Sequence, residues 1–88
     1  MDYVLTAQAD LQSATRALRQ AGSDLWFNGL SEDWQQFLAG HTLDCHKNYR
    51  IPLAKAALAV VRVYQNLLLA DPSVKDANPW QIDGAFSL

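Results

Sequence analysis

The residues from Leu53 to Ala70 would be apolar around nearly their whole circumference if they formed a helix. Their polar members Lys55, Arg62 and Asn66 fall on one narrow stripe. A helix with so little polar surface has to be covered by other segments. A chain of 88 residues has room for only two more helices of similar length, and these cannot surround it. The sequence therefore predicts a homo-oligomer in which a neighbouring copy completes the cover.

The same stretch is long enough to cross a bilayer, but Lys55, Arg62, Gln65 and Asn66 interrupt it. It is therefore interpreted as a buried helix of a soluble protein. The N-terminal residues carry Asp2 and contain no apolar core segment, so they do not form a secretory signal. We expect a cytoplasmic protein without membrane contact.

The spacing of apolar residues predicts an all-α fold. The expected architecture is a small three-helix bundle with helices at about 3–27, 32–50 and 53–70. Pro52 separates the second helix from the third, because proline disfavours helical geometry in the residue before it and is favoured in the first turn of a helix. Either the third helix begins at Pro52 or one long helix kinks there, so Pro52 is expected to act as a hinge.

Apolar residues of the first helix recur at alternating steps of three and four, which is typical of a packing seam. The seam consists of Val4, Ala7, Leu11, Ala14, Leu18, Ala21 and Leu25. Because Leu25 keeps this register, we expect the helix to continue past Gly22. The alternative is a break at Gly22, followed by a separate turn that carries Trp26 and Phe27.

The second helix is expected to use Ser31 as its N-cap, with Glu32 and Asp33 at the positive end of the helix dipole. Aromatic and apolar residues then recur on its inward face at steps of three and four. That face consists of Trp34, Phe37 or Leu38, His41, Cys45 and Tyr49.

The chain is expected to contain one helical bundle domain, 1–70, followed by a C-terminal tail, 71–88. The large apolar residues of the tail are Trp80, Ile82, Phe86 and Leu88. A tail in solvent rarely keeps so many large apolar groups together. We therefore expect the tail to pack on the bundle or on a neighbouring subunit.

Both histidines and the only cysteine lie in the segment 41–50, HTLDCHKNYR. His41 and Cys45 are four residues apart, so on a helix their side chains lie one above the other and could bind one metal ion, with His46 as a third candidate. Haem is the other cofactor that such residues could hold. A zinc site needs four ligands, which would require a second copy of the chain. The sequence favours the alternative, in which His41 and Cys45 simply face inward.

Lys47 and Arg50, with His46 and Lys55 nearby, could contact an anion. Cations near the C-terminus of a helix are favourable through the helix dipole alone, and this structural role is the simpler interpretation. The formal net charge is −2. A nucleic-acid partner is therefore not expected, because such binding requires a basic face.

The sequence contains no paired carboxylates suited to acid–base catalysis and no glycine-rich phosphate loop, so no enzymatic activity is expected. Tryptophan and tyrosine are common at the centre of interfaces. The expected interaction residues are Trp26, Trp34, Tyr64 and Trp80. The primary hypothesis is a small interaction or regulatory protein without a cofactor, which binds another macromolecule as a homo-oligomer. The alternative is an oligomeric zinc- or haem-binding protein that uses His41, Cys45 and His46.

Overall fold

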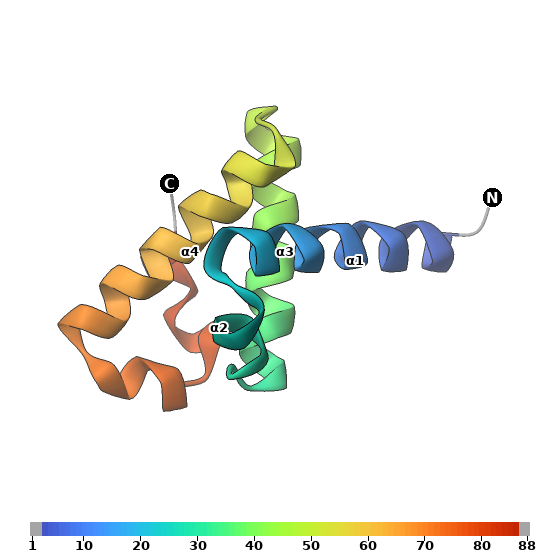
Figure 1. The fold of residues 1–88 in the computed structure, drawn as a ribbon. Coiled ribbons are helices and arrows are strands. Elements are labelled where there is room, and N and C mark those ends of the chain that lie inside the picture. The colour runs from blue at the N-terminus through green and yellow to red at the C-terminus, as the bar shows by residue number, and fades with distance from the viewer. Residues whose placement is uncertain (1–2, 87–88) are drawn as a thin grey trace.

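The computed structural model describes residues 3–86, with the side chains of residues 10–82, 84 and 86. Within these residues the chain forms helices and no strand, which confirms the predicted all-α class. The helices are α1 (Tyr3–Gly22), α2 (Asp24–Asn28), α3 (Glu32–Tyr49), α4 (Leu53–Ala70) and the 3-10 helices η1 (Pro72–Asp76) and η2 (Pro79–Phe86) (Figure 1). Residues 1–2 and 87–88 of the two predicted domains lie outside the described residues.

The first helix ends at Gly22, so the prediction that it continues to residue 27 is wrong and the alternative of a break is correct. Ser23 has a φ angle of 111°, which is not helical, and its hydroxyl accepts the N–H of Trp26 at 3.1 Å to begin α2. Gly22 fits this turn because a Cβ atom there would lie 2.7 Å from the Trp26 ring, which would have to move. The break turns Phe27 into the core and leaves Leu25 90% exposed.

α3 begins as predicted with Ser31 as its N-cap, whose hydroxyl accepts the N–H of Trp34 at 3.3 Å. The side-chain amide of Gln35 donates to the backbone carbonyls of Phe27 and Leu30, at 3.1 and 3.0 Å. These bonds tie the end of α2 to the first turns of α3, so the short helix α2 is held in place by the longer one.

α3 and α4 are separate helices that meet in a turn at Arg50, Ile51 and Pro52. Arg50 adopts the left-handed conformation that ends many helices, although glycine is the usual residue there. Pro52 directly precedes α4 and has no N–H to leave unpaired. The chain reverses direction at this turn (Figure 1), so Pro52 marks a sharp connection between two helices rather than a kink within one.

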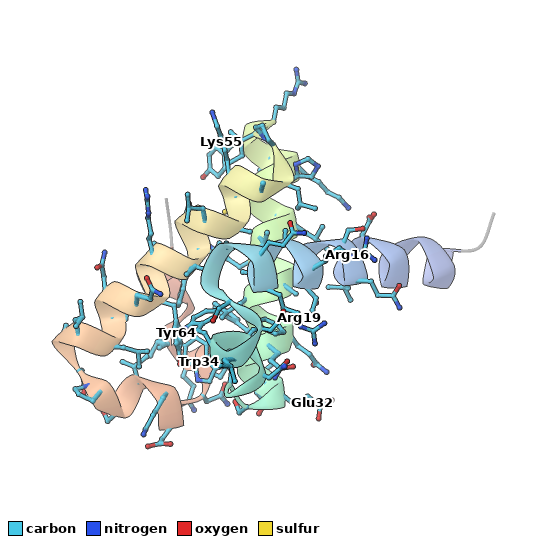
Figure 2. All side chains as sticks on the ribbon, in the orientation of Figure 1. Arg16, Arg19, Glu32, Trp34, Lys55 and Tyr64 are labelled. Carbon is cyan, nitrogen blue, oxygen red and sulfur yellow. The ribbon has the colours of Figure 1, made fainter. Side chains whose placement is uncertain are left out.

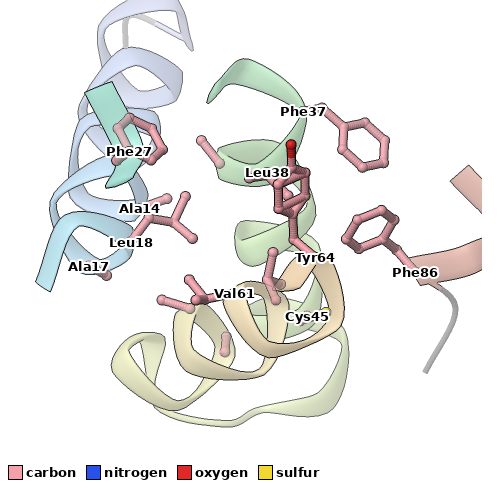
Figure 3. Packing of buried hydrophobic residues seen from close by; sticks show 14 of the residues in the cluster. Ala14, Ala17, Leu18, Phe27, Phe37, Leu38, Cys45, Val61, Tyr64 and Phe86 are labelled. Carbon is pink, nitrogen blue, oxygen red and sulfur yellow. The ribbon is translucent and has the colours of Figure 1, made fainter. Parts of the chain in front are cut away.

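Helices α1, α3 and α4 contact one another pairwise and enclose the core. Figure 3 shows Ala14, Ala17 and Leu18 of α1 on one side of this core, with Leu38 of α3 and Val61 of α4 in its middle. Small side chains such as alanine let neighbouring helices approach closely.

Only part of the predicted seam of α1 packs inside the chain. Ala14 and Leu18 are fully buried, whereas Leu11 is exposed. Val4 and Ala7 fall outside the residues whose side chains the structure describes. The N-terminal half of α1 extends beyond α3 (Figure 1), and the molecule accordingly measures 43 Å in its longest dimension but 24 Å in the other two.

The residues after α4 pack against the bundle. Asp71 caps η1 by accepting the hydroxyl and the N–H of Ser73 at 2.7 and 3.1 Å, and these bonds hold the pKa of its carboxyl below the usual range. η1 contacts α4, and η2 contacts α3. Phe86 is buried beside Phe37, with ring centres 5.2 Å apart, so the C-terminal residues form one wall of the core.

α4 is only partly covered by the rest of the chain. Its buried residues are Ala56, Ala57, Val60, Val61 and Tyr64. Leu58 is exposed, and Leu69 is exposed at 84%. Among the described residues, α4 is the one helix long and apolar enough to cross a membrane, and the core helix of a soluble bundle meets the same criteria. Part of its apolar surface is therefore open in the single chain.

Candidate functional site

The two histidines of α3 both bond to backbone carbonyls, but in different parts of the molecule. Nε2 of His41 lies 2.7 Å from the carbonyl oxygen of Phe86, at the end of η2. Nδ1 of His46 lies 2.6 Å from the carbonyl oxygen of Ile51, in the turn before α4. A carbonyl oxygen only accepts, so each of these ring nitrogens carries a hydrogen. His41 therefore fastens the C-terminal segment to α3, and His46 closes the turn between α3 and α4.

One residue near the end of α3 differs from its predicted position. The prediction that Tyr49 faces inward is wrong, since its side chain is 56% exposed. The His46 ring is half-buried and bonded to Ile51. α3 ends at Tyr49, and the next residue, Arg50, adopts the left-handed conformation. The last turn of the helix therefore projects past the core.

Cys45 is buried in the hydrophobic core. Burial, together with the neighbouring Asp44 carboxylate, raises the pKa of its thiol above the usual range. The thiolate is the form that binds metals and attacks electrophiles, and this environment disfavours it. The position of Cys45 therefore agrees with the interpretation of an inward-facing core residue.

His41, Cys45 and His46 do not converge on one point. Across the part of the chain that the structure describes, no three side chains of His, Cys, Asp or Glu come close enough to hold a metal ion. Each histidine also uses one ring nitrogen to hold a backbone carbonyl. Zinc or haem binding by these residues stays a prediction, which metal analysis and an absorption spectrum of the purified protein test directly.

The predicted anion contacts lie at the end of α3. Lys47 forms an ion pair with Asp10 of α1, with Nζ and Oδ2 3.2 Å apart, and the two side chains are 60% and 40% exposed. Arg50 is exposed in the following turn. Figure 2 shows Lys55 at this end of the molecule and Glu32 at the opposite end. An anion contact by Lys47 and Arg50 stays a prediction, and in the single chain Lys47 already has a carboxylate partner.

The four predicted interaction residues divide between the core and the surface. Trp34 and Tyr64 are fully buried between the helices and meet edge to face, with ring centres 4.6 Å apart (Figure 2). Trp26 is half-buried, 5.7 Å from the Tyr64 ring. Trp80 is 53% exposed, and its ring lies 5.9 Å from that of Phe37 in an edge-to-face arrangement. Trp80 is therefore the one of the four that offers most of its ring to a partner.

Tyr64 lies beside a hollow of about 410 Å³, which α4, η1 and the turn between α2 and α3 enclose. Burial, together with the Asp76 carboxylate on the rim of this hollow, raises the pKa of the Tyr64 hydroxyl. The hydroxyl therefore keeps its proton at neutral pH, and the residue acts as a packing group of the core.

A second hollow, which we name the Trp80 notch, lies on the outer surface of α3. It measures about 240 Å³ and is lined by Gln36, Phe37, Gly40, His41, Asp44 and Trp80. Gln36, Gly40 and Asp44 are spaced by four residues, which places them on one face of α3. Sequence reasoning missed this site, because that spacing was the only local signal and the opposite wall comes from Trp80, a residue of η2.

Comparison with known proteins finds no matching family model, no similar curated protein and no similar solved structure. Function therefore has to follow from the geometry of the chain itself.

Proposed function

We propose that this chain is a small non-enzymatic interaction protein, which forms a homo-oligomer and acts by binding another protein. The observation that carries the proposal is the apolar surface that the single chain leaves open. The large hydrophobic side chains exposed among the described residues are Leu11, Leu25, Tyr49, Leu58, Leu69 and Trp80. Apolar surface of this kind is what a second copy or a partner protein covers.

The exposed face of α4 is well suited to a second copy of the chain. Leu58, Arg62, Gln65 and Leu69 are all exposed and follow one another at steps of three and four residues, so they share one face of the helix. In an antiparallel contact between two copies of α4, Leu58 of each copy meets Leu69 of the other. Arg62 then meets Gln65, because both pairs share the same midpoint of the helix. Such a contact is self-complementary, as a two-fold interface requires.

Analytical ultracentrifugation at micromolar concentration tests the oligomer. We expect the wild-type chain to sediment as a dimer or larger assembly. The double variant Leu58→Gln, Leu69→Gln should sediment as a monomer with an unchanged far-UV circular dichroism spectrum, since both side chains are exposed in the single chain. Leu25→Gln is the matched control, because it makes the same change at an exposed position outside α4.

A well-folded wild-type monomer in this experiment would reject the homo-oligomer. The protein partner is tested separately, by cross-linking the tagged chain in its native host and identifying the captured protein. The proposal requires that the captured protein binds the purified chain and that substitutions of the exposed apolar residues weaken the binding. Wild-type affinity in all of those variants would reject the apolar surface as the binding site.

A further inference from the structure

We infer that the Trp80 notch binds the side chain of an arginine that a partner protein presents. This inference rests on the proposed function only in that a partner protein carries the arginine.

Most of the polar groups of the notch that remain open are hydrogen-bond acceptors. The side-chain nitrogen of Gln36 donates one of its two hydrogens to Glu32 at 3.4 Å, and the Gln36 carbonyl oxygen is open as an acceptor. Nε2–H of His41 is engaged with the carbonyl of Phe86, and when the ring carries only this hydrogen its Nδ1 is an acceptor. The carboxylate of Asp44 only accepts. Such a set fits a ligand group that is rich in donors, and the arginine guanidinium carries five N–H donors and no acceptor.

The charge of the notch also favours a cation from outside. Asp44 is exposed, and none of the six lining residues is a lysine or an arginine. Lys47 lies one helical turn beyond Asp44 along α3, but its ammonium is paired with Asp10 at 3.2 Å. No lysine or arginine among the residues that line the Trp80 notch therefore pairs with the Asp44 carboxylate.

Aromatic rings form the remaining lining. The Phe37 and His41 rings lie nearly parallel, at 9° with centres 5.9 Å apart. Trp80 stands edge to face with Phe37, and its backbone N–H bonds to Asn78 at 3.0 Å, which fixes the start of η2. A guanidinium stacks flat on the face of tryptophan and can bond to a carboxylate through two N–H groups of its rigid fork, whereas an ammonium is a compact, more strongly hydrated charge without that planar fork. Arginine therefore fits the notch better than lysine.

Gly40 leaves open space in this lining. A Cβ atom added at Gly40 would meet no other atom within 4 Å. Alanine is a better helix former than glycine, so Gly40→Ala should stabilise α3. The same methyl group would occupy part of the notch. This substitution therefore separates the stability of the fold from binding in the notch, because the two should change in opposite directions.

The test titrates the isotope-labelled full-length chain with N-acetyl-arginine amide and follows the indole N–H signal of Trp80 by NMR. We expect a saturable shift with a dissociation constant on the order of 1 mM, as befits one side chain in an open site. N-acetyl-citrulline amide has the same shape without the charge, and it should give no saturable shift. N-acetyl-lysine amide should bind more weakly than the arginine derivative.

Three variants test whether the arginine derivative binds in the Trp80 notch. Asp44→Asn should weaken binding of the arginine derivative by about 2- to 5-fold, as for other exposed ion pairs. Gly40→Ala should also weaken binding while it raises the midpoint of thermal unfolding. Asp33→Asn is the matched control, because it removes an exposed carboxylate from the same helix outside the notch, and it should bind like the wild type.

Several results would overturn the inference: no saturable shift in the wild type, equal shifts with the citrulline or lysine derivative, or wild-type affinity in Asp44→Asn. Because the probe is a small molecule, none of these results depends on the oligomeric state. Conversely, a monomeric chain would reject the contact through α4 and leave the binding of arginine in the notch intact.

Discussion

The side chains that α1 buries in the core are two alanines and one leucine, whereas the side of the core that faces η2 is lined by aromatic rings (Figure 3). On the α1 side, α1 contributes Ala14, Ala17 and Leu18, and the Phe27 ring of α2 lies beside them. The aromatic side consists of Trp34, Phe37, Tyr64 and Phe86, and ring centres of neighbouring pairs lie 4.6 to 6.1 Å apart. The same two helices, α3 and α4, are thus covered in two different ways.

The difference follows from what covers each side. α1 is a helix of 20 residues, so it is long enough to cover this side of α3 and α4. Its alanines allow its backbone to come close to these neighbouring helices. η2 has only 8 residues and contributes Phe86, so most of this side is filled by the large rings of α3 and α4 themselves, and aromatic rings bury the largest area for each residue. The α1 side therefore depends on the absence of bulk, and the aromatic side depends on a few large residues.

Trp34→Ala should have the largest effect on stability. The ring is fully buried and contacts the rings of Phe37, Tyr64 and Phe86. Truncation of such a residue lowers the free energy of unfolding by about 3–5 kcal/mol. At about 0.05–0.15 kcal/mol for each residue, a chain of 88 residues has a free energy of unfolding of about 4–13 kcal/mol, so this variant loses a large part of its stability. Urea unfolding followed by far-UV circular dichroism measures the change.

Trp80→Ala is the control for Trp34→Ala, since Trp80 is a half-exposed tryptophan at the edge of the same aromatic side. It should lower the free energy of unfolding by much less. If the two variants lost equal stability, the aromatic side would not be the part of the core that depends on a few buried rings.

Ala14→Leu tests the opposite requirement of the α1 side. Ala14 is fully buried, so three additional carbons have no space unless α1 moves away from the core. Overpacking of this kind lowers the free energy of unfolding by about 1–3 kcal/mol. Ser13→Leu adds similar bulk at the neighbouring exposed position and should leave stability nearly unchanged. Equal stability of Ala14→Leu and the wild type in urea unfolding would contradict close packing on the α1 side.

The sequence predicted parts of both sides, where the signals are local. The inward positions of Ala14, Leu18, Trp34 and Phe37, the N-cap Ser31 and the turn at Pro52 depend only on helix periodicity and on the chemistry of single residues. Ala17 is buried although it lies outside the predicted seam. The break after Gly22 was only the alternative prediction, because Leu25 continues the periodic pattern. Ser23 adopts a positive φ angle that serine seldom adopts, so its residue type gave no warning.

The candidate site shows the same limit more strongly. The helix spacing correctly placed Cys45 in the core. It could not show that His41 bonds to Phe86 or that Trp80 closes a notch on α3, because each of these contacts joins α3 to η2. Such contacts depend on where the C-terminal segment returns to the bundle, and periodicity within α3 contains no information about that path.

His41→Phe should loosen the aromatic side without removing its packing, because phenylalanine keeps the ring and loses the N–H that binds the Phe86 carbonyl. Loss of one hydrogen bond lowers the free energy of unfolding by about 0.5–1.5 kcal/mol. Backbone amides of η2 should exchange their hydrogens faster, and amides of α1 should not, as measured by hydrogen–deuterium exchange.

His46→Phe is the matched control for His41→Phe. It removes a bond of similar length to Ile51, which lies in the turn between α3 and α4 and not in η2. Its effect on exchange should therefore be confined to that turn. Faster exchange of η2 in His46→Phe, or unchanged exchange of η2 in His41→Phe, would contradict the role of His41 in fastening the C-terminal segment.

Leu25→Gln should have the smallest effect on the free energy of unfolding. It tests whether the chain breaks between α1 and α2. If α1 continued through Leu25 in register, this leucine would extend the α1 side of the core beyond Leu18 and its replacement by a polar residue would be strongly destabilising. In the structure Leu25 is 90% exposed, so the substitution should change the free energy of unfolding by no more than about 0.5 kcal/mol. Leu18→Gln, the same change at a fully buried position, gives the scale for comparison in the same urea titration. A loss in Leu25→Gln that approaches the loss in Leu18→Gln would mean that the first helix runs past Ser23 in solution.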